Sequence, residues 1–244
     1  MTASETGAAD VRWTVEDLHD DREAVEASLA TAEEEAQAFA DQYRGRIADL
    51  SPEELATALD RLDALQDRLG RAYAFAYLRW TTDTNDEARG AFLQSVREAY
   101  NRINQTLLFV EVEWAGIEDE QVEEILDHEV LDDYRHYLEV EHQQKEHVLS
   151  EPEEKVLSEK QITGKQAWTR YFDETLGATR YELDGEELTQ EEVLSKLYEP
   201  DRSLRREAAL SFTEGLKENR RSLTFVFNTL LSDKASTDRL RGYD

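Results

Sequence analysis

Histidine is the residue type in this chain best suited to metal or proton chemistry. The sequence contains five: His19, His128, His136, His142 and His147. The string His128-Glu129-Val130-Leu131-Asp132 starts like H-E-x-x-H, in which two histidines four residues apart hold zinc and the glutamate acts as base. Here Asp132 takes the place of the second histidine, and the string crosses a predicted junction between two helices. We therefore expect no zinc site of this type at His128.

Two acid-x-x-His spacings occur in one stretch, at Asp133/His136 and Glu139/His142. Carboxylate-bridged metal sites in helical bundles use this spacing, but they also need glutamates on facing helices. With 56 acidic residues among 244, the spacings arise by chance and are more simply explained as a solvated helix face. His142 and His147 lie five residues apart, about 140° around a helix, so they cannot chelate one ion. We expect no catalytic, cofactor-binding or metal-binding residue in this chain.

Other sites with recognisable sequence signatures are missing. The sequence has no G-x-x-x-x-G-K-[ST], no G-x-S-x-G and no G-x-G-x-x-G after a strand. The lack of cysteine excludes a thiol nucleophile, a Cys-ligated zinc site and a disulfide scaffold. Tyr73, Phe75, Tyr77 and Trp80 could stack a ligand, but their helical spacing favours a place in the core.

The charge of the chain limits its partners. With 56 acidic and 28 basic residues, the formal net charge is −28, which argues against nucleic acid or an anionic membrane. The longest apolar run, residues 72–78, is far shorter than the ~20 residues that cross a bilayer. The opening MTASETGAAD has neither a basic nor an apolar stretch of a secretion signal. We expect a cytoplasmic protein.

The excess of acid also suggests the environment of the host. A compact monomer of 28.2 kDa exposes about 11,000 Å², which spaces the carboxylates about 14 Å apart. Neighbours at this spacing repel each other across a screening length of ~10 Å at 0.1 M salt, but not across ~3 Å at 1 M. We expect a salt-loving host. An acidic mesophilic protein and a surface for a cationic partner remain as alternatives.

Helix is the predicted structure for most of the chain, because apolar residues recur every three or four positions and the chain has only 10 Gly and 3 Pro. Ser51, Ser150 and Thr189 each stand three residues before a glutamate, the spacing of a capping box. We expect about eight helices, with seven delimited as 55–80, 86–114, 119–128, 131–147, 152–174, 190–198 and 201–233.

One segment alternates instead. Residues 179–188 contain Asp184-Gly185, a dipeptide that favours the positive φ angles of a tight hairpin turn, so we expect one small β-hairpin. The first ten residues are expected to be disordered, and residues 11–244 to form one helical region.

The last expected helix has more apolar residues than one buried face needs. We therefore expect several of them to be exposed in this chain, on a surface that a partner would cover. The set is Phe212, Leu216, Leu223, Phe225, Phe227, Leu230 and Leu231.

Five strings mark nearly the whole chain. They are W-T-V-E-D-L from Trp13, H-V-L-S-E-P-E-E-K-V-L-S from His147, T-G-K-Q-A-W-T-R-Y-F-D-E from Thr163, L-D-G-E-E-L-T from Leu183, and F-N-T-L-L-S-D-K from Phe227 followed by R-G-Y at Arg241. In this order they resemble the N-terminal part of oligoendopeptidase F, a branch of the thimet-oligopeptidase-like zinc metallopeptidases. Val15 and His19 stand where the family pattern has Leu and Tyr.

The resemblance implies a nearly all-helical, cleft-forming enzyme in which H-E-x-x-H and a later Glu hold zinc and activate water against short oligopeptides. That machinery lies downstream of the matching part in the family, so this chain is expected to form part of the cleft without the catalytic half. We expect zinc in the intact enzyme, none bound by this chain, and no peptidase activity from this chain alone. The alternative is a non-catalytic helical binding or scaffold protein derived from such an enzyme.

Overall fold

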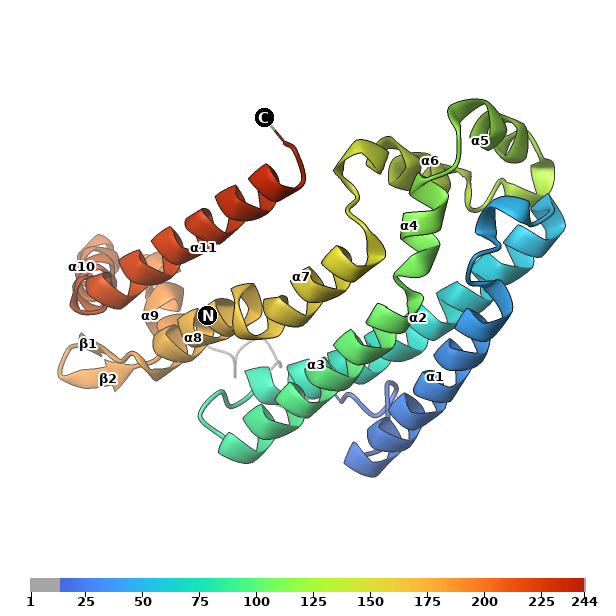
Figure 1. The fold of residues 1–244 in the computed structure, drawn as a ribbon. Helices are drawn as coiled ribbons and strands as arrows, with labels where there is room; N and C mark the ends of the chain where they lie inside the picture. The colour runs from blue at the N-terminus through green and yellow to red at the C-terminus, as the bar shows by residue number, and fades with distance from the viewer. Residues whose placement is uncertain (1–13, 244) are drawn as a thin grey trace.

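The computed structural model describes residues 14–243, so the segment 1–10 that we expected to be disordered lies outside the described residues, as does Trp13. Within this range the chain is mostly helical, with one two-stranded antiparallel sheet (Figure 1). This confirms the expected fold class. The α-helices and strands are α1 (Arg22–Tyr43), α2 (Pro52–Thr81), α3 (Glu87–Leu107), α4 (Phe109–Ala115), α5 (Asp119–Leu126), α6 (Arg135–Gln143), α7 (Glu151–Thr163), α8 (Lys165–Ala178), β1 (Tyr181–Leu183), β2 (Glu186–Leu188), α9 (Gln190–Ser195), α10 (Arg202–Glu218) and α11 (Arg220–Leu240).

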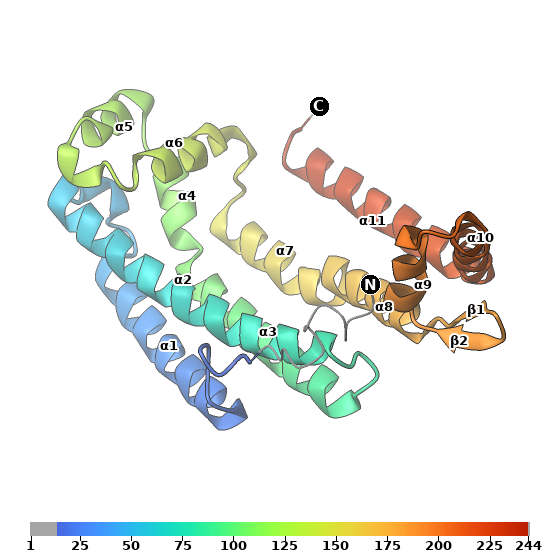
Figure 2. The ribbon, with the colours of Figure 1, turned by 180° about the vertical axis from the view of Figure 1, so that it is seen from behind.

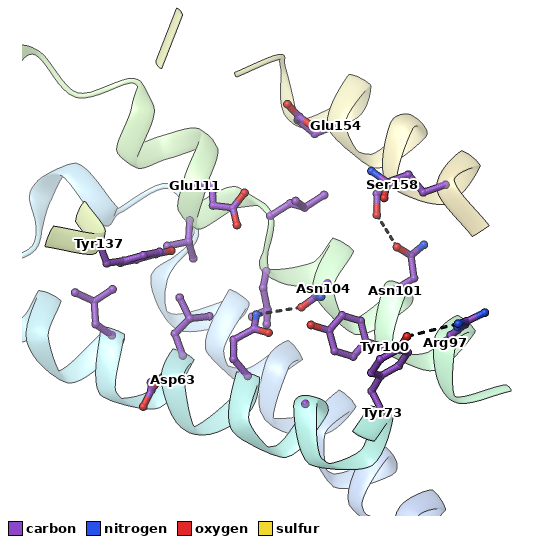
Figure 3. Close-up of a pocket in the computed structure, with 18 of the residues that line it drawn as sticks. Asp63, Tyr73, Arg97, Tyr100, Asn101, Asn104, Glu111, Tyr137, Glu154 and Ser158 are labelled. Atoms are coloured by element: carbon purple, nitrogen blue, oxygen red, sulfur yellow. Dashed lines mark hydrogen bonds between the residues drawn. The ribbon is translucent and has the colours of Figure 1, made fainter. Parts of the chain in front are cut away.

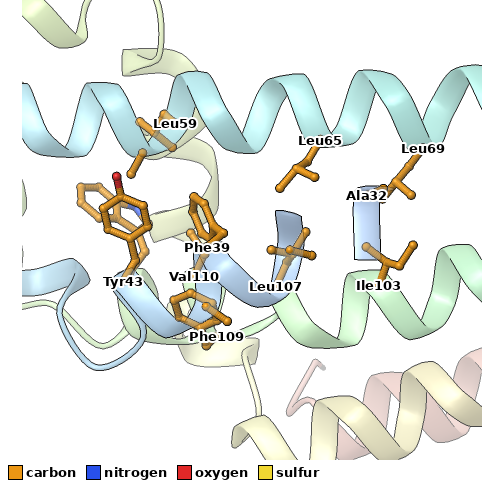
Figure 4. Close-up of a cluster of buried hydrophobic side chains, with 14 of the residues drawn as sticks. Ala32, Phe39, Tyr43, Leu59, Leu65, Leu69, Ile103, Leu107, Phe109 and Val110 are labelled. Atoms are coloured by element: carbon orange, nitrogen blue, oxygen red, sulfur yellow. The ribbon is translucent and has the colours of Figure 1, made fainter. Parts of the chain in front are cut away.

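The main core lies between α1, α2 and α3 (Figure 4). Leu59, Leu65 and Leu69 line one face of α2 and are buried with Phe39 of α1 and Ile103 of α3. Helix α1 was not delimited by the sequence patterns, because alanines make up much of its buried face and give a weak hydrophobic signal.

The three expected N-caps all begin helices. At the start of α2, Ser51 Oγ accepts from the Glu54 amide at 3.2 Å, and Glu54 Oε2 accepts from the Ser51 amide at 3.0 Å. Thr189 begins α9 with the same reciprocal pair. At α7, the amide and hydroxyl of Ser150 both donate to Glu153 Oε2, at 3.1 and 2.6 Å. These bonds satisfy backbone groups that have no partner inside the first helical turn.

Three expected helices are each divided, so the described chain has more helices than the eight expected. The first, 86–114, bends at Leu108 into α3 and α4. A straight helix would spread Leu107, Phe109 and Val110 over more than one face, whereas the bend lets all three be buried. The Arg44 guanidinium donates to the Thr106 carbonyl at 3.0 Å beside this bend.

The second division is at Gly164, between α7 and α8, where the backbone has φ −99° and ψ −113°. A Cβ at this position would lie 2.8 Å from the Lys160 carbonyl oxygen, so only glycine fits. The third division separates α10 from α11 at Asn219. The Asn219 amide nitrogen Nδ2 donates to Thr179 Oγ1 at 3.0 Å and ties this corner to the segment before the hairpin.

The hairpin is confirmed within residues 179–188. Asp184 and Gly185 have φ angles of 54° and 82°, as the expected turn requires. Tyr181 and Leu183 of β1 point into a second, smaller core with Val193 and Ala208.

The main core lies beside the long rod formed by α7 and α8, and the second core lies at the far end of α8 (Figures 1 and 2). Helix α3 packs against α7, and α11 packs against α8, yet neither α7 nor α8 has a fully buried residue. The accessible surface is 15754 Å², well above the ~11,000 Å² of a compact chain of this mass. The acidic side chains are therefore spaced more widely than we expected, at about 17 Å.

Candidate functional site

A groove of about 1080 Å³ lies between α2, α3 and α4 on one side and α7 and α8 on the other (Figure 3). Residues from the segment around α6 close one end of it. The bend at Leu108 positions the groove, because it turns α4 away from the line of α3. The break at Gly164 sets the direction of α8 along the opposite wall.

The middle of the groove is lined by amides. Gln66 Nε2 donates to Asn104 Oδ1 at 3.1 Å, and Ser158 Oγ donates to Asn101 Oδ1 at 2.6 Å (Figure 3). Asn104 Nδ2 and Gln66 Oε1 have no hydrogen-bond partner among the described side chains. Amides with an open donor and an open acceptor are suited to the N–H and C=O groups of an extended peptide.

One end of the groove is acidic. Glu111 lies there beside Tyr137, and neither side chain is fully buried (Figure 3). Surrounding protein atoms, then Glu141 and Glu154, raise the pKa of Glu111 above its usual range, and Arg241 partly opposes this. Desolvation likewise raises the pKa of Glu141 and that of the Tyr137 phenol. Desolvation is thus the main cause at this end, and repulsion from Glu141 and Glu154 adds to it at Glu111.

Glu154 lines the same groove and forms an ion pair with a cationic side chain. Arg241, at the end of α11, forms two hydrogen bonds with it, at 2.5 and 2.7 Å. Burial opposes ionisation, but the Arg241 guanidinium and the Leu149 amide hold the pKa of Glu154 below its usual value. Arg241 also donates to the His147 carbonyl at 3.0 Å, and its own carbonyl lies 2.9 Å from His147 Nδ1. These contacts join the end of α11 to the start of α7.

The opposite end of the groove carries Arg97 and Lys165. The Arg97 guanidinium lies over the ring of Tyr73, 5.9 Å from its centre and 3.5 Å from its hydroxyl (Figure 3). Neither cation has a carboxylate within 4.0 Å in the described part of the chain. Asp173 is near enough for Arg97 to lower its pKa, although burial of Asp173 dominates and raises it.

The structure disperses the histidines. His128 caps a short 3₁₀ turn, Glu129–Leu131, so the H-E-x-x-D string does cross a helix junction. His142 Nε2 lies 2.8 Å from Asp119 rather than facing Glu139, and His147 contacts the backbone of Arg241. His19 packs edge-on against Phe75 at 6.0 Å. Among residues 14–243, no group of three or more His, Asp or Glu side chains is placed to hold a metal ion.

The aromatic patch divides between core and groove. Phe75 and Trp80 are buried, as their spacing predicts, whereas Tyr73 and Tyr77 are half-buried and stack at 5.7 Å. Of the four, only Tyr73 lines the groove. Sequence reasoning missed Arg97, Glu111 and Tyr137, because no motif or fixed spacing marks them.

No described helix is long and apolar enough to span a membrane.

Three of the seven apolar residues named for the last expected helix are exposed, whereas Phe212 packs against the second core. Phe225, Phe227 and Leu231 are 58%, 63% and 51% exposed. The other four of the expected set are half-buried: Phe212, Leu216, Leu223 and Leu230.

Comparisons with known proteins relate this chain to peptidases. The family described as Oligopeptidase F matches residues 113–181, which run from α4 to β1 and include one wall of the groove. Oligopeptidase PepF of Bacillus subtilis (strain 168) is 31% identical over 157 residues, covering 64% of this chain and 23% of that protein.

Two solved structures share the fold. Oligoendopeptidase-F from Enterococcus faecium matches with a TM-score of 0.76 and 18% identity, over 92% of this chain and 45% of that one. A putative peptidase from Chlamydophila abortus matches with a TM-score of 0.55 and 18% identity, over 97% of this chain and 41% of that one. The chain thus spans about a quarter of its curated relative and less than half of each solved structure.

Proposed function

This chain resembles the N-terminal part of oligoendopeptidase F in sequence and in fold, and on that premise we propose that it forms one wall of the substrate cleft of a peptidase acting on short peptides. The observation that carries the proposal is the superposition on Enterococcus faecium oligoendopeptidase-F across 92% of the chain. The groove supports it, because its amides and tyrosines suit an extended peptide rather than a nucleotide or a lipid.

The exposed apolar face of α11 supports a missing partner. Phe227 and Leu231 are four residues apart and so lie on one side of the helix, both more than half exposed. Contiguous apolar surface of this kind normally marks an interface. We assign it to contact with the catalytic half of the same enzyme, which would also reduce the unusually large accessible surface.

The described residues do not fit a catalytic zinc site, since none of their carboxylates and histidines form a three-ligand group. The zinc that the resemblance implies would therefore be held by residues outside these 244. In this proposal the chain contributes binding surface and excludes bulk water, and it carries no catalytic residue. We also propose a salt-loving host, on the strength of the net charge of −28.

The proposal is tested by expressing residues 1–244 and the full reading frame that contains them, side by side. We expect the longer protein to contain H-E-x-x-H downstream, to retain about one zinc per chain after dialysis and to cleave an internally quenched peptide. Residues 1–244 alone should do neither. Tight stoichiometric zinc on the short chain would contradict the proposal. A reading frame without the motif and without activity would instead favour the non-catalytic binding protein.

A further inference from the structure

The groove has unlike charges at its two ends, and this arrangement points to the way a peptide lies in it. Figure 3 shows Glu111, Tyr137 and Asp63 toward one end, Asn104 between, and Arg97 with Tyr73 toward the other. We propose that the groove binds a short peptide as a zwitterion, with its terminal carboxylate at Arg97 and Lys165 and its terminal ammonium at Glu111. The inference rests on the proposed function in taking an oligopeptide as the occupant.

The cationic end is unusual for this protein. Acidic residues outnumber basic ones two to one, and most surfaces therefore offer a cation several carboxylates. Arg97 and Lys165 nevertheless have no ion-pair partner within residues 14–243. The Tyr73 ring and hydroxyl hold the Arg97 guanidinium in place, so less side-chain freedom is lost when an anion binds. A carboxylate can accept two parallel hydrogen bonds from such a guanidinium.

The acidic end is complementary to an ammonium group. Glu111 has Glu141 and Glu154 as charged neighbours, and the nearest cation, Arg241, is already hydrogen-bonded to Glu154. An incoming ammonium would offset repulsion that the protein itself leaves uncompensated. The Tyr137 ring beside Glu111 adds an aromatic face, which also attracts cations.

The helices that form the floor set the length of the occupant. Asp63 and Tyr73 are ten residues apart on α2, which corresponds to about 15 Å along the helix axis. An extended peptide advances about 3.3 Å per residue, so a chain of about five residues spans the two charged ends. Shorter peptides reach only one end.

The test measures binding of one pentapeptide, Gly-Leu-Phe-Leu-Gly, to the 244-residue chain by titration calorimetry at a fixed KCl concentration. The peptide is used in four forms: free at both ends, amidated at the carboxyl end, acetylated at the amino end, and blocked at both. We expect amidation and acetylation each to weaken binding about tenfold, the scale of one charge-assisted hydrogen-bonded contact. Unblocked peptides of three to nine residues should gain affinity up to about five residues and lose it beyond that length, because a longer extended peptide cannot place both of its ends in the groove.

Variants show which end of the peptide each charged residue of the groove contacts. Arg97→Gln should weaken the free peptide about tenfold and leave the amidated peptide almost unchanged, because both changes remove the same contact. Arg102→Gln is the matched control: it lies on the same helix, removes the same charge and contacts Glu33 away from the groove. Glu111→Gln should weaken binding of the free peptide about tenfold and leave binding of the acetylated peptide almost unchanged. Glu120→Gln, on the exposed side of α5, is its control.

If Arg97→Gln weakened the free peptide but left the acetylated peptide unchanged, Arg97 would contact the amino end, and the proposed orientation would be wrong. Equal effects of Arg97→Gln and Arg102→Gln, or no binding of any form at millimolar peptide, would overturn the recognition of the ends altogether. Loss of end coupling in a full-length protein that still cleaves peptides would defeat this inference alone. End-coupled binding by a full-length protein that has no peptidase activity would defeat the proposed function alone.

Discussion

Two glutamates that line the same groove affect the stability of the fold in opposite directions when they ionise. Glu111 has like charges around it and a raised pKa, whereas Glu154 has Arg241 and a lowered pKa. A raised carboxyl pKa means that the folded state binds the proton more tightly than the unfolded chain. For Glu111, folding is therefore favoured as the pH falls through that raised pKa. For Glu154, whose pKa is lowered in the folded state, folding becomes less favourable as the pH falls through that lowered pKa.

Glu111→Gln should stabilise the protein at pH 7, because the neutral amide has neither the desolvation cost of the carboxylate nor its repulsion from Glu141 and Glu154. We expect the thermal midpoint to rise by about 2 °C, a modest change because the side chain remains accessible to solvent. The gain should disappear below about pH 4, where the native carboxyl is also neutral. Thermal unfolding followed by circular dichroism measures both effects, with Glu120→Gln as the control. A lowered midpoint at pH 7 would contradict the prediction.

Glu154→Gln should destabilise the protein at pH 7 by about 1–3 kcal/mol, because it leaves the Arg241 guanidinium without its charged partner. The Glu154 side chain is only 12% exposed, so water replaces the lost bonds poorly. The stabilising effect is complete above the unfolded pKa of about 4.3 and is lost as the pH falls through the lower folded value. Urea unfolding at pH 7 and pH 3 measures the difference, and Glu146→Gln is an exposed control. Equal stabilities of the variant and the wild type at pH 7 would disprove it.

Little of the groove could be predicted from the sequence. Its acidic and basic ends come from helices brought together by tertiary packing, and an isolated Arg97 or Glu111 in so charged a chain carries no pattern. The histidines, in contrast, were singled out by residue type as candidates for chemistry, but two of them make structural contacts. His142 contacts Asp119, and His147 contacts the backbone carbonyl of Arg241.

Among the elements, caps and the hairpin were predictable because each depends on residues adjacent in the chain. Ser51 with Glu54 and Asp184 with Gly185 act over one to three residues. The divisions at Leu108 and Asn219 were not predictable, because each depends on a partner far along the chain. Leu108 bends to bury Phe109 and Val110 against α1 and α2, and Asn219 turns the chain toward Thr179.

The glycine that divides α7 from α8 provides a test at this scale. Gly164→Ala should destabilise the fold by about 1–3 kcal/mol, since its Cβ would meet the Lys160 carbonyl at 2.8 Å and the backbone must shift. Gly70→Ala is the matched control, because that glycine is inside α2 with nothing within 4 Å of the added Cβ. It should stabilise by about 0.5–1 kcal/mol. Chemical denaturation of both variants checks the prediction, and a neutral or stabilising Gly164→Ala would contradict it.

For the whole molecule, the charge of −28 should make stability depend on salt. Acidic side chains about 17 Å apart lie beyond the ~10 Å screening length of 0.1 M salt, so each pair repels only weakly there, and the remaining repulsion is removed at 1 M, where that length is ~3 Å. The thermal midpoint should therefore rise between 0.1 M and 1 M KCl. A series with sorbitol of equal osmolality separates charge screening from water activity. A flat or falling midpoint in KCl would remove the argument for a salt-loving host.

The rod of α7 and α8, which has no fully buried residue and separates a large core from a small one, governs how the chain loses its structure. Cooperativity is transmitted by shared buried contacts, and the Arg241 to Glu154 pair, which joins the end of α11 to this rod, is a partly exposed ion pair instead. We expect residues 179–240 to open before the bundle of α1, α2 and α3. Calorimetry should then show two transitions, and hydrogen exchange should be faster in β1 and α10 than in α2. A single transition with uniform protection would mean that the rod couples both cores as one unit. In the expected case each core has its own free energy of unfolding, and a substitution changes the stability of the unit that contains it.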